Sequence, residues 1–215
     1  MSKDYYLITS KETGQTSMAS MTIIDPKTGN VVASSAGIGA DRTKTYLGYF
    51  NYVTDLKKQT GSSIKPLAVV AAGLENNKIN AASVFYDGPT TFPGVKNANG
   101  TLKVFKNEGA YRYYYMTLRE AIAFSQNIPN LKAMSLIGVA NSAKFCQSIG
   151  LDDITGNEGI TLALGALTHG VSTVQMAAAY AMISNNGIYI EPTFYSKVTD
   201  KSGNIIVEPK SVEDR

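Results

Sequence analysis

The segment after Gly61 restricts the fold more than any other, because it is apolar on almost every side of a helix. Pro66 is tolerated only in the first turn of a helix, which predicts a helix that starts near Ser62 or Ser63 and runs to about Leu74. A helix without a polar face is stable only when other elements surround it. The chain has 215 residues, 44% of them hydrophobic and 17% charged, which is enough to bury such a helix.

The rest of the chain is predicted to contain both helices and short strands. A strand over residues 16–24 and its partner over 31–33 are joined by turn residues at 25–30. Thr117 and Glu120 have the spacing of a capping box at a helix start. Residues 1–15 are predicted to form a polar arm, and residues 76–116 an irregular functional surface. Further helices are predicted over residues 117–124, 129–138, 140–149 and 173–184, and further strands over 188–190, 194–199 and 204–207.

Composition excludes several kinds of function. Cys146 and His169 are the only cysteine and histidine, so an internal disulfide or a metal site built on several thiolates or imidazoles is impossible. The net charge of +3 comes from scattered basic residues, which gives no indication of nucleic-acid binding. The longest apolar runs are too short or too interrupted to span a bilayer. We expect no metal, no cofactor and no role for His169, and we predict that Cys146 is a small buried side chain.

The strongest chemical signal is Ser62-Ser63-Ile64-Lys65, an S-x-x-K pattern at the start of the predicted helix. Residues three apart share a helix face, so the hydroxyl of Ser62 and the amine of Lys65 can meet. Serine becomes a nucleophile when a base takes its proton, and burial beside a positive helix N-terminus lowers the pKa of a lysine. The same N-terminus offers the backbone N–H of Ser62 to an oxyanion. The alternative is that Ser62 or Ser63 is an N-cap and that Lys65 is solvated.

A second pattern, Ser125-Gln126-Asn127, lies at a predicted break between two helices, where side chains can point into a cleft. Ser125 is also a possible cap for the helix predicted to begin at Pro129. Other S-x-N matches at 184–186 and 202–204 are interpreted as a helix cap and a turn, and K-T/S-G matches at 27–29 and 201–203 as turns. A tyrosine cluster is predicted to be packed, with ligand contact as the alternative: Tyr111, Tyr113, Tyr114 and Tyr115.

Taken together, these segments resemble the transpeptidase domain of penicillin-binding proteins, the serine acyltransferases that cross-link peptidoglycan. The similarity runs from about Thr16 to Val207. The Leu-Ala-Leu-Gly sequence at 162–165 is more similar to the bifunctional class A group than to the monofunctional class B group. The matching segments are, in chain order, residues 24–29, 50–51, 61–66, 116–121, 125–129, 162–165, 176–180 and 186–187, followed by Pro192.

The resemblance implies a fold and a set of roles. The fold would be the α+β fold of penicillin-binding proteins and serine β-lactamases, over residues 16–215, with a sheet flanked by helices and a mostly helical subdomain. Ser62 would attack the D-Ala-D-Ala end of a stem peptide, with Lys65 as general base. Ser125 would relay a proton to the leaving amine, and Asn127 would hold Lys65 and bind the substrate amide. β-Lactam antibiotics would acylate the same serine, and the domain would work on the outer face of a bacterial cytoplasmic membrane.

The family's third motif, Lys-Thr/Ser-Gly on a strand that lines the cleft, would lie beyond Arg215. We therefore expect an incomplete domain that needs a second polypeptide or a missing C-terminal segment carrying this motif. The glycosyltransferase domain and the membrane anchor of class A proteins are also outside this sequence. Two alternatives remain open: a serine β-lactamase or β-lactam sensor domain, and a non-catalytic scaffold with the same fold.

Overall fold

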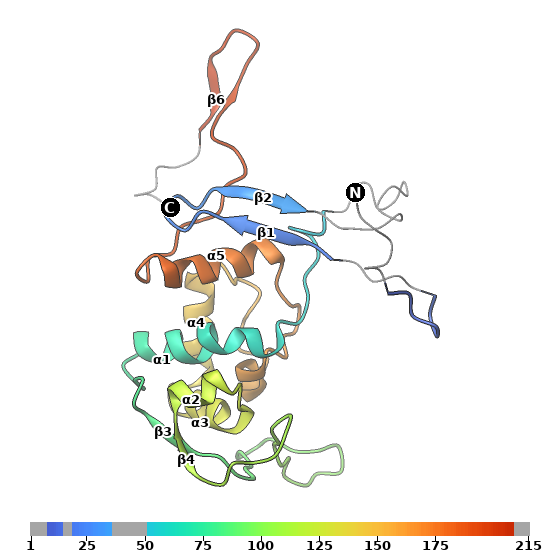
Figure 1. Cartoon of the computed structure of the whole chain (residues 1–215), viewed down its shortest axis with the longest axis vertical. Coiled ribbons are helices and arrows are strands. Elements are labelled where there is room, and N and C mark those ends of the chain that lie inside the picture. Colours follow the sequence, from blue (N-terminus) through green and yellow to red (C-terminus); the bar gives the residue numbers. More distant parts are fainter. Residues whose placement is uncertain (1–7, 15–18, 36–50, 209–215) are drawn as a thin grey trace. The chain divides into compact units, whose positions relative to one another are not determined.

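A computed structural model describes residues 8–14, 19–35 and 51–208 of the chain. These residues fall into two compact units (Figure 1). One unit lies within Met1–Lys58, Ile149–Leu151 and Val171–Arg215, and the other within Gln59–Ser148 and Asp152–Gly170. Helices and strands occur in both, which confirms the predicted α+β class. The predicted polar arm lies mostly outside the described residues, as do residues 16–18 and Phe50.

The first unit is built on a strand pair and one helix. Strand β1 (Met21–Ile24) pairs antiparallel with β2 (Val31–Ser35), and Ile23 faces Ala33 in the register. The predicted turn joins them, with the N–H of Gly29 donating to the carbonyl of Asp25 at 2.9 Å and Gly29 at a φ of +71°. Helix α5 (Thr173–Ser184) lies along this pair (Figure 1). The described part of the first predicted strand is shorter than expected, because it begins at Met21.

Helix α5 has the predicted bounds, but the strands predicted after it are partly wrong. Asn185 ends the helix, and it exchanges hydrogen bonds with Ile188: the N–H of Ile188 donates to its carbonyl, and its Nδ2 donates to the carbonyl of Ile188. Backbone groups used in this cap are not available for a strand over 188–190. The predicted strand at 194–199 is reduced to β5 (Val198–Thr199), which pairs with β6 (Ile205–Val207) across the predicted turn.

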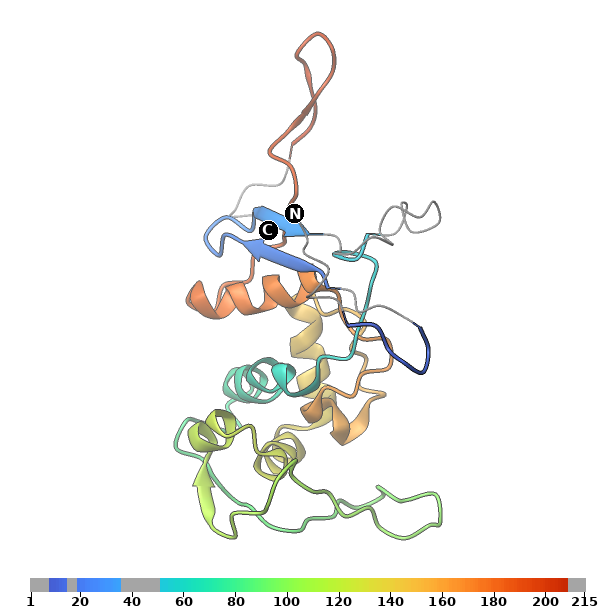
Figure 2. The same cartoon turned by 45° about the vertical axis from the view of Figure 1, so that its right-hand side comes forward.

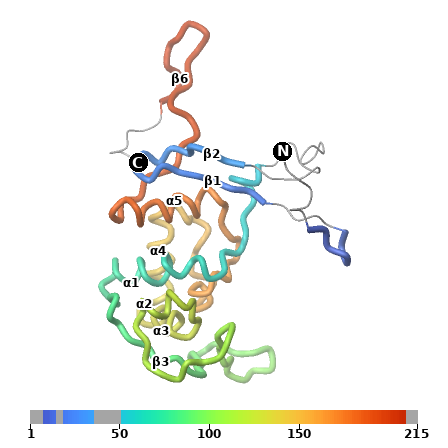
Figure 3. The backbone as a smooth tube through the Cα atoms, viewed as in Figure 1, coloured from blue at the N-terminus to red at the C-terminus, as the bar shows by residue number. Residues whose placement is uncertain are grey.

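The second unit is organised around one continuous rod, Gly61–Glu75, which Figure 3 shows as a single coil. The rod begins as a 3₁₀ turn (η3, Gly61–Ile64), widens to a π-helix (η4, Lys65–Ala71) and ends as an α-helical turn (α1, Ala72–Glu75). The predicted helix is therefore present, although its winding changes twice. Its core-facing residues are fully buried, whereas Leu74 is 49% exposed and departs from the predicted all-round burial. The buried apolar residues of the rod are Ile64, Leu67, Ala68, Val69 and Ala72.

Four helices of the second unit pack around this rod (Figure 2). The predicted capping box is confirmed: Thr117 Oγ1 accepts from the N–H of Glu120, whose carboxylate accepts from the N–H of Thr117. On α4, Ser142 is buried and donates to the carbonyl of Ala68 at 2.6 Å, so it pairs an oxygen of the π-helical part of the rod. The four helices are α2 (Leu118–Ala123), α3 (Asn127–Ile137), α4 (Val139–Ser148) and the 3₁₀ helix η5 (Gly159–Leu164), and this last helix was not predicted.

The segment predicted as irregular contains a second strand pair. Strand β3 (Val84–Tyr86) pairs antiparallel with β4 (Tyr115–Thr117), and Phe85 faces Met116. Residues 87–114 form the β3–β4 loop. The predicted packing of the tyrosine cluster is only partly found: Tyr111 is half-buried and packs edge-on against Tyr113, whereas Tyr113, Tyr114 and Tyr115 are 43–71% exposed. Met116 is fully buried, and successive side chains of a strand point to opposite faces, so Tyr115 faces outward. None of the helices in the described ranges is long and apolar enough to cross a membrane.

Candidate active site

Four side chains of the second unit meet around one buried amine. The Nζ of Lys65 donates to Ser62 Oγ at 3.0 Å and to Asn127 Oδ1 at 2.8 Å. It also contacts Ser125 twice, at 2.8 Å to the backbone carbonyl and 3.2 Å to Oγ. The structure thus brings together all four residues that the two sequence patterns singled out. Two of them lie at the start of the rod, and the other two lie between α2 and α3 and at the first residue of α3.

The 3₁₀ turn explains how Ser62 and Lys65 meet. In a 3₁₀ helix there are three residues per turn, so side chains at positions i and i+3 lie directly above one another. Ser62 is exposed at the first turn, whereas Lys65 is 1% exposed. The alternative of a solvated lysine is therefore wrong. A side-chain cap is also wrong, because Thr60 occupies the N-cap position without a side-chain hydrogen bond and Ser63 Oγ donates to the Thr60 carbonyl.

The backbone conformation of Ser125 points both its carbonyl oxygen and its side-chain hydroxyl at Lys65. Ser125 has a φ of +52°, a left-handed conformation that is uncommon for a residue with a Cβ. It follows α2, with its N–H donating to the carbonyl of Ile122 at 3.0 Å. Helix α3 begins at Asn127 rather than at Pro129, and Gln126 rather than Ser125 occupies its N-cap position. Ser125 is therefore no cap for α3, and its Oγ is within reach of Lys65 instead.

The surroundings of Lys65 make its amine a weaker base than an ordinary lysine. Burial lowers the pKa of Lys65 from 10.5 to about 8, and the negative charge of Glu108 acts in the opposite direction. A buried ammonium loses its hydration, which favours the neutral amine. A lysine with this pKa is neutral in an appreciable fraction of molecules near pH 7, and a neutral amine can accept the proton of Ser62. Glu108 was not singled out in the sequence, because it lies in the β3–β4 loop without a recognisable pattern.

The remaining sequence candidates lie elsewhere in the chain. Cys146 is fully buried in α4, as predicted, and burial raises the pKa of its thiol to about 12. His169 is exposed. The two K-T/S-G matches occupy the β1–β2 and β5–β6 turns, as predicted. Among the residues that the structure describes, no group of three or more histidine, cysteine, aspartate or glutamate side chains is placed to hold a metal ion.

Comparison with known proteins gives the family. The model of the family described as "Penicillin binding protein transpeptidase domain" matches residues 19–215. The chain belongs to this family. It is 33% identical over 213 residues to penicillin-binding protein 1A of Clostridium botulinum, which covers 96% of this chain and 25% of that relative. It is also 33% identical to penicillin-binding protein 1F of Bacillus subtilis, over 92% of this chain and 26% of the relative. The chain thus spans about a quarter of the length of these curated relatives.

Solved structures agree with this assignment. Penicillin-binding protein 1A from Haemophilus influenzae superimposes with a TM-score of 0.72 and 27% identity, over 95% of this chain and 30% of that one. A peptidoglycan synthetase from Bifidobacterium adolescentis has a TM-score of 0.69 at 18% identity, over 90% and 37% of the two chains, and supports the fold alone. The predicted family and the penicillin-binding protein fold are confirmed, and the relatives are of class A, as the Leu-Ala-Leu-Gly sequence indicated.

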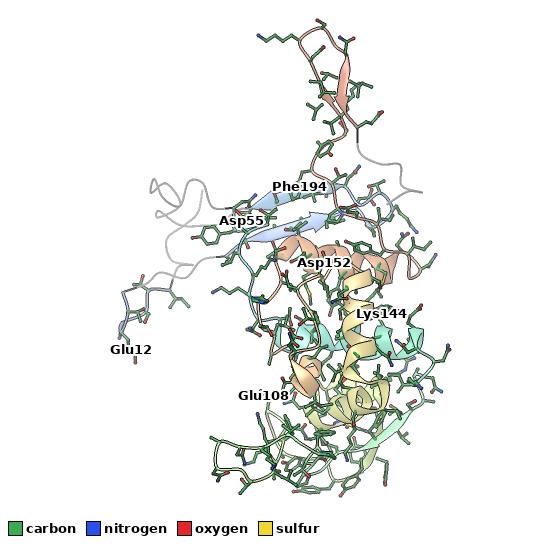
Figure 4. The ribbon with its side chains drawn as sticks, turned by 180° about the vertical axis from the view of Figure 1, so that it is seen from behind. Glu12, Asp55, Glu108, Lys144, Asp152 and Phe194 are labelled. Atoms are coloured by element: carbon green, nitrogen blue, oxygen red, sulfur yellow. The ribbon has the colours of Figure 1, made fainter. Side chains whose placement is uncertain are left out.

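Glu108 is labelled in Figure 4, and its negative charge leads to a prediction about the pKa of Lys65 and the rate of acylation. In Glu108→Gln the negative charge that raises the pKa of Lys65 is lost, so the pKa falls further and more of the amine is neutral at pH 7. We expect the rate of acylation by a fluorescent penicillin at pH 7 to rise about two- to threefold, a modest effect because the carboxylate is exposed. Glu75→Gln, an exposed glutamate at the end of α1, is the matched control. A slower rate in Glu108→Gln alone would assign Glu108 a different role.

Proposed function

We propose that this domain is the acylating part of a serine D,D-transpeptidase that cross-links peptidoglycan stem peptides. The observation that carries the proposal is the contact of 3.0 Å between Lys65 Nζ and Ser62 Oγ, with the lysine buried and its pKa lowered to about 8. An exposed hydroxyl beside a buried amine of lowered pKa is the arrangement expected of a nucleophile and its base. The family assignment supports the same reaction class.

In the acylation step, neutral Lys65 takes the proton of Ser62 while Oγ forms a bond to the carbonyl carbon of the penultimate D-alanine. The carbonyl oxygen becomes an oxyanion, and the backbone N–H of Ser62 at the start of the rod is a donor for it. Collapse of this intermediate breaks the C–N bond to the terminal D-alanine. The leaving amine needs a proton, and Ser125 Oγ, at 3.2 Å from Lys65 Nζ, relays one from the protonated lysine.

In the second step, an amine of a neighbouring stem peptide attacks the carbonyl carbon of the acyl-enzyme. A new peptide bond forms, the bond from that carbon to Ser62 Oγ breaks, and the proton that the amine loses returns to Ser62 through Lys65. Asn127 holds Lys65 through Oδ1 and uses one N–H of its amide on the carbonyl of Lys106, at 3.1 Å. An amide group has two N–H donors, so one remains for the substrate. A β-lactam acylates the same serine, and its acyl group stays because no acceptor displaces it quickly.

The complete reaction draws on parts that lie outside the matched quarter of the relatives. We propose that a Lys-Thr/Ser-Gly segment, in the same polypeptide or a second one, supplies another oxyanion donor and a site for the substrate carboxylate. Loss of one oxyanion donor lowers the rate by about 10²–10³. The substrate, peptidoglycan, places the working domain on the outer face of the bacterial cytoplasmic membrane.

The test is labelling with a fluorescent penicillin and mass spectrometry of the modified peptide. It uses the 215-residue chain and an extended form, in which the chain is joined to the region that follows the matched part in penicillin-binding protein 1A of Clostridium botulinum. We expect one adduct per extended molecule, on Ser62, and none in Ser62→Ala. Ser63→Ala is the matched control, because Ser63 is also exposed and donates to the Thr60 carbonyl instead.

Three outcomes contradict the proposal in different ways. No label on the folded extended form would contradict acylation and favour a non-catalytic scaffold. An adduct on another residue would contradict the assignment of Ser62. Hydrolysis of many equivalents of nitrocefin would contradict a slow deacylation and favour a serine β-lactamase, which needs a positioned water and its own base for that step.

The lowered pKa of Lys65 predicts the pH dependence of acylation. The base must be neutral, so the rate rises with pH through about 8 and falls about tenfold per pH unit well below that value. Measured from pH 6 to 9.5 in the extended form, the labelling rate constant should give this acid limb. A rate that still rises tenfold per pH unit up to pH 9.5, as expected for the ordinary lysine pKa of 10.5, would show that Lys65 is not desolvated in the working enzyme.

A further inference from the structure

Two buried residues of the β3–β4 loop, Asp87 and Asn107, form a chain of hydrogen bonds that ends at the proposed base. We propose that Asn107 and Asp87 are positioning residues, which fix Asn127 and through it Lys65 for acyl transfer. The inference rests on the proposed function, because it gives these two residues a task in that reaction. Neither touches the reacting atoms in the described contacts, so neither is a catalytic residue.

The first link in this chain of hydrogen bonds joins Asn107 to the start of α3. Asn107 Oδ1 accepts from the backbone N–H of Asn127 at 2.9 Å and of Ile128 at 3.1 Å. The first N–H groups of a helix have no partner within it, and α3 has no side-chain cap of its own. A side chain from a distant loop therefore caps the helix at the residue whose own Oδ1 accepts from Lys65.

The second link joins the Asn107 amide to Asp87 and fixes the orientation of that amide. Its Nδ2 donates to both carboxylate oxygens of Asp87, at 2.9 and 3.1 Å. A carboxylate only accepts hydrogen bonds, so it selects the orientation in which Nδ2 faces Asp87 and Oδ1 faces the helix. In the flipped amide, Oδ1 of Asn107 would face the carboxylate oxygens of Asp87, and Nδ2 would face the backbone N–H donors at the start of α3. Asp87 thus determines which atom of Asn107 reaches α3.

Asp87 itself is held in place by the backbone of the β3–β4 loop. Asp87 is fully buried, directly after β3, where its N–H donates to the carbonyl of Tyr114 and its carbonyl accepts from the N–H of Tyr113. Its Oδ2 also accepts from the N–H of Arg112 at 2.8 Å. These contacts join the two ends of the loop that carries Asn107. The charge of Asp87 acts on Lys132 of α3, since it opposes the lowering of that lysine's pKa by burial.

These contacts matter for the reaction because the position of the Lys65 amine depends on a small set of hydrogen-bond acceptors. Its amine is held by oxygens of three residues, and the acceptor on Asn127 is one of the two shortest contacts. The other face of the Asn127 amide is also held by this loop, through the Lys106 carbonyl. A displaced α3 start would therefore move the proposed base relative to Ser62, and a misplacement of about 1 Å can cost about 10²-fold in rate.

The test exchanges the two side chains. In Asn107→Asp, two carboxylates face each other, and in Asp87→Asn, an amide N–H faces another donor. The double variant Asp87→Asn/Asn107→Asp restores one carboxylate and one amide, with the carboxylate now capping α3. Asp152→Asn is the control: it is the same change at an exposed aspartate of the same unit, labelled in Figure 4.

Two measurements on the extended form are read together. The first separates reversible binding of the penicillin from its acylation rate constant. The second is hydrogen exchange of the Asn127 and Ile128 backbone amides. We expect Asn107→Asp to lower the acylation constant about 10²-fold with little change in binding, and to speed exchange of both amides. The double variant should recover both to within about tenfold, and Asp152→Asn should change neither. A general loss of folding would lower the labelled fraction at saturation but not the rate per labelled molecule.

Failure of the inference can be told apart from failure of the proposed function. If the parent protein is acylated on Ser62 and folded Asn107→Asp is acylated at the same rate, the positioning role is wrong and the function stands. Unchanged exchange at Asn127 and Ile128 would also overturn the inference. A parent that takes no label contradicts the proposed function itself. If Asn107→Asp does not fold, the milder Asp87→Asn carries the same comparison with the double variant.

Discussion

Lys65→Met will slow acylation of Ser62 by orders of magnitude and leave the domain folded. General-base catalysis contributes about 10²–10⁴ in rate, so we expect the rate of labelling by a fluorescent penicillin to fall by about this factor. Methionine is similar in length to lysine and fills irregular buried space well. Burying an amine costs solvation free energy, which methionine does not lose. The carbonyl of Ser125 and the buried Oδ1 of Asn127 each lose a donor, which acts in the opposite direction, so we expect the midpoint of denaturant unfolding to change little.

Two further variants define what the lysine does. Lys144→Met is the matched control, because Lys144 is exposed on α4 in the same unit (Figure 4), and it should label at the parent rate. Lys65→Arg keeps a positive charge and hydrogen-bond donors, but a guanidinium does not lose its proton in proteins. We expect Lys65→Arg to be inactive as well, since a charge without basicity cannot accept the proton of Ser62. Rapid labelling of Lys65→Arg would show that charge alone activates the serine.

The parts of the site that the sequence predicted are those fixed by local geometry. Ser62 and Lys65 are three residues apart, so an α-helix or a 3₁₀ helix brings them to one face, and the observed 3₁₀ turn aligns them more closely than an α-helix would. The capping box of Thr117 and Glu120 was predictable for the same reason, since each partner satisfies the other's backbone within one turn. Family resemblance, rather than geometry, joined Ser125 and Asn127 to this pair.

The parts that could not be predicted depend on contacts between distant segments. Asn107 caps a helix 20 residues away, and the sequence shows only a polar loop at that position. Asp87 lies in the segment that was predicted to be irregular, and nothing in the sequence indicates that its carboxylate is fully buried. Strands β3 and β4 are only three residues long, too short for alternation to be visible among the tyrosines. A change from 3₁₀ to π winding has no signature in helix propensity, which ranks residues for α-helices alone.

Gly165→Ala will displace the turn that carries Ser62. Gly165 ends η5 in a left-handed conformation, with a φ of +73°. A Cβ at this position would lie 2.1 Å from the carbonyl oxygen of Gly61 and 2.5 Å from its nitrogen, far closer than real contacts allow. Both obstacles are backbone atoms of the residue before Ser62, so no side chain can rotate away. This close approach explains physically why the Leu-Ala-Leu-Gly sequence ends in glycine.

The expected cost of Gly165→Ala has two parts, and a second glycine separates them. The left-handed conformation costs alanine about 1–2 kcal/mol, and overpacking a filled site costs about 1–3 kcal/mol. Gly159→Ala is the matched control, because Gly159 begins the same 3₁₀ helix at a φ of +59° with nothing within 4 Å of its Cβ position. Both variants should lower the free energy of unfolding in urea, Gly165→Ala more strongly. Only Gly165→Ala should slow the labelling of folded molecules, about 10²-fold, since it moves Gly61 and with it the nucleophile relative to Lys65. Equal labelling rates in the two folded variants would show that the start of the rod is held in place without the close packing of Gly165 on Gly61.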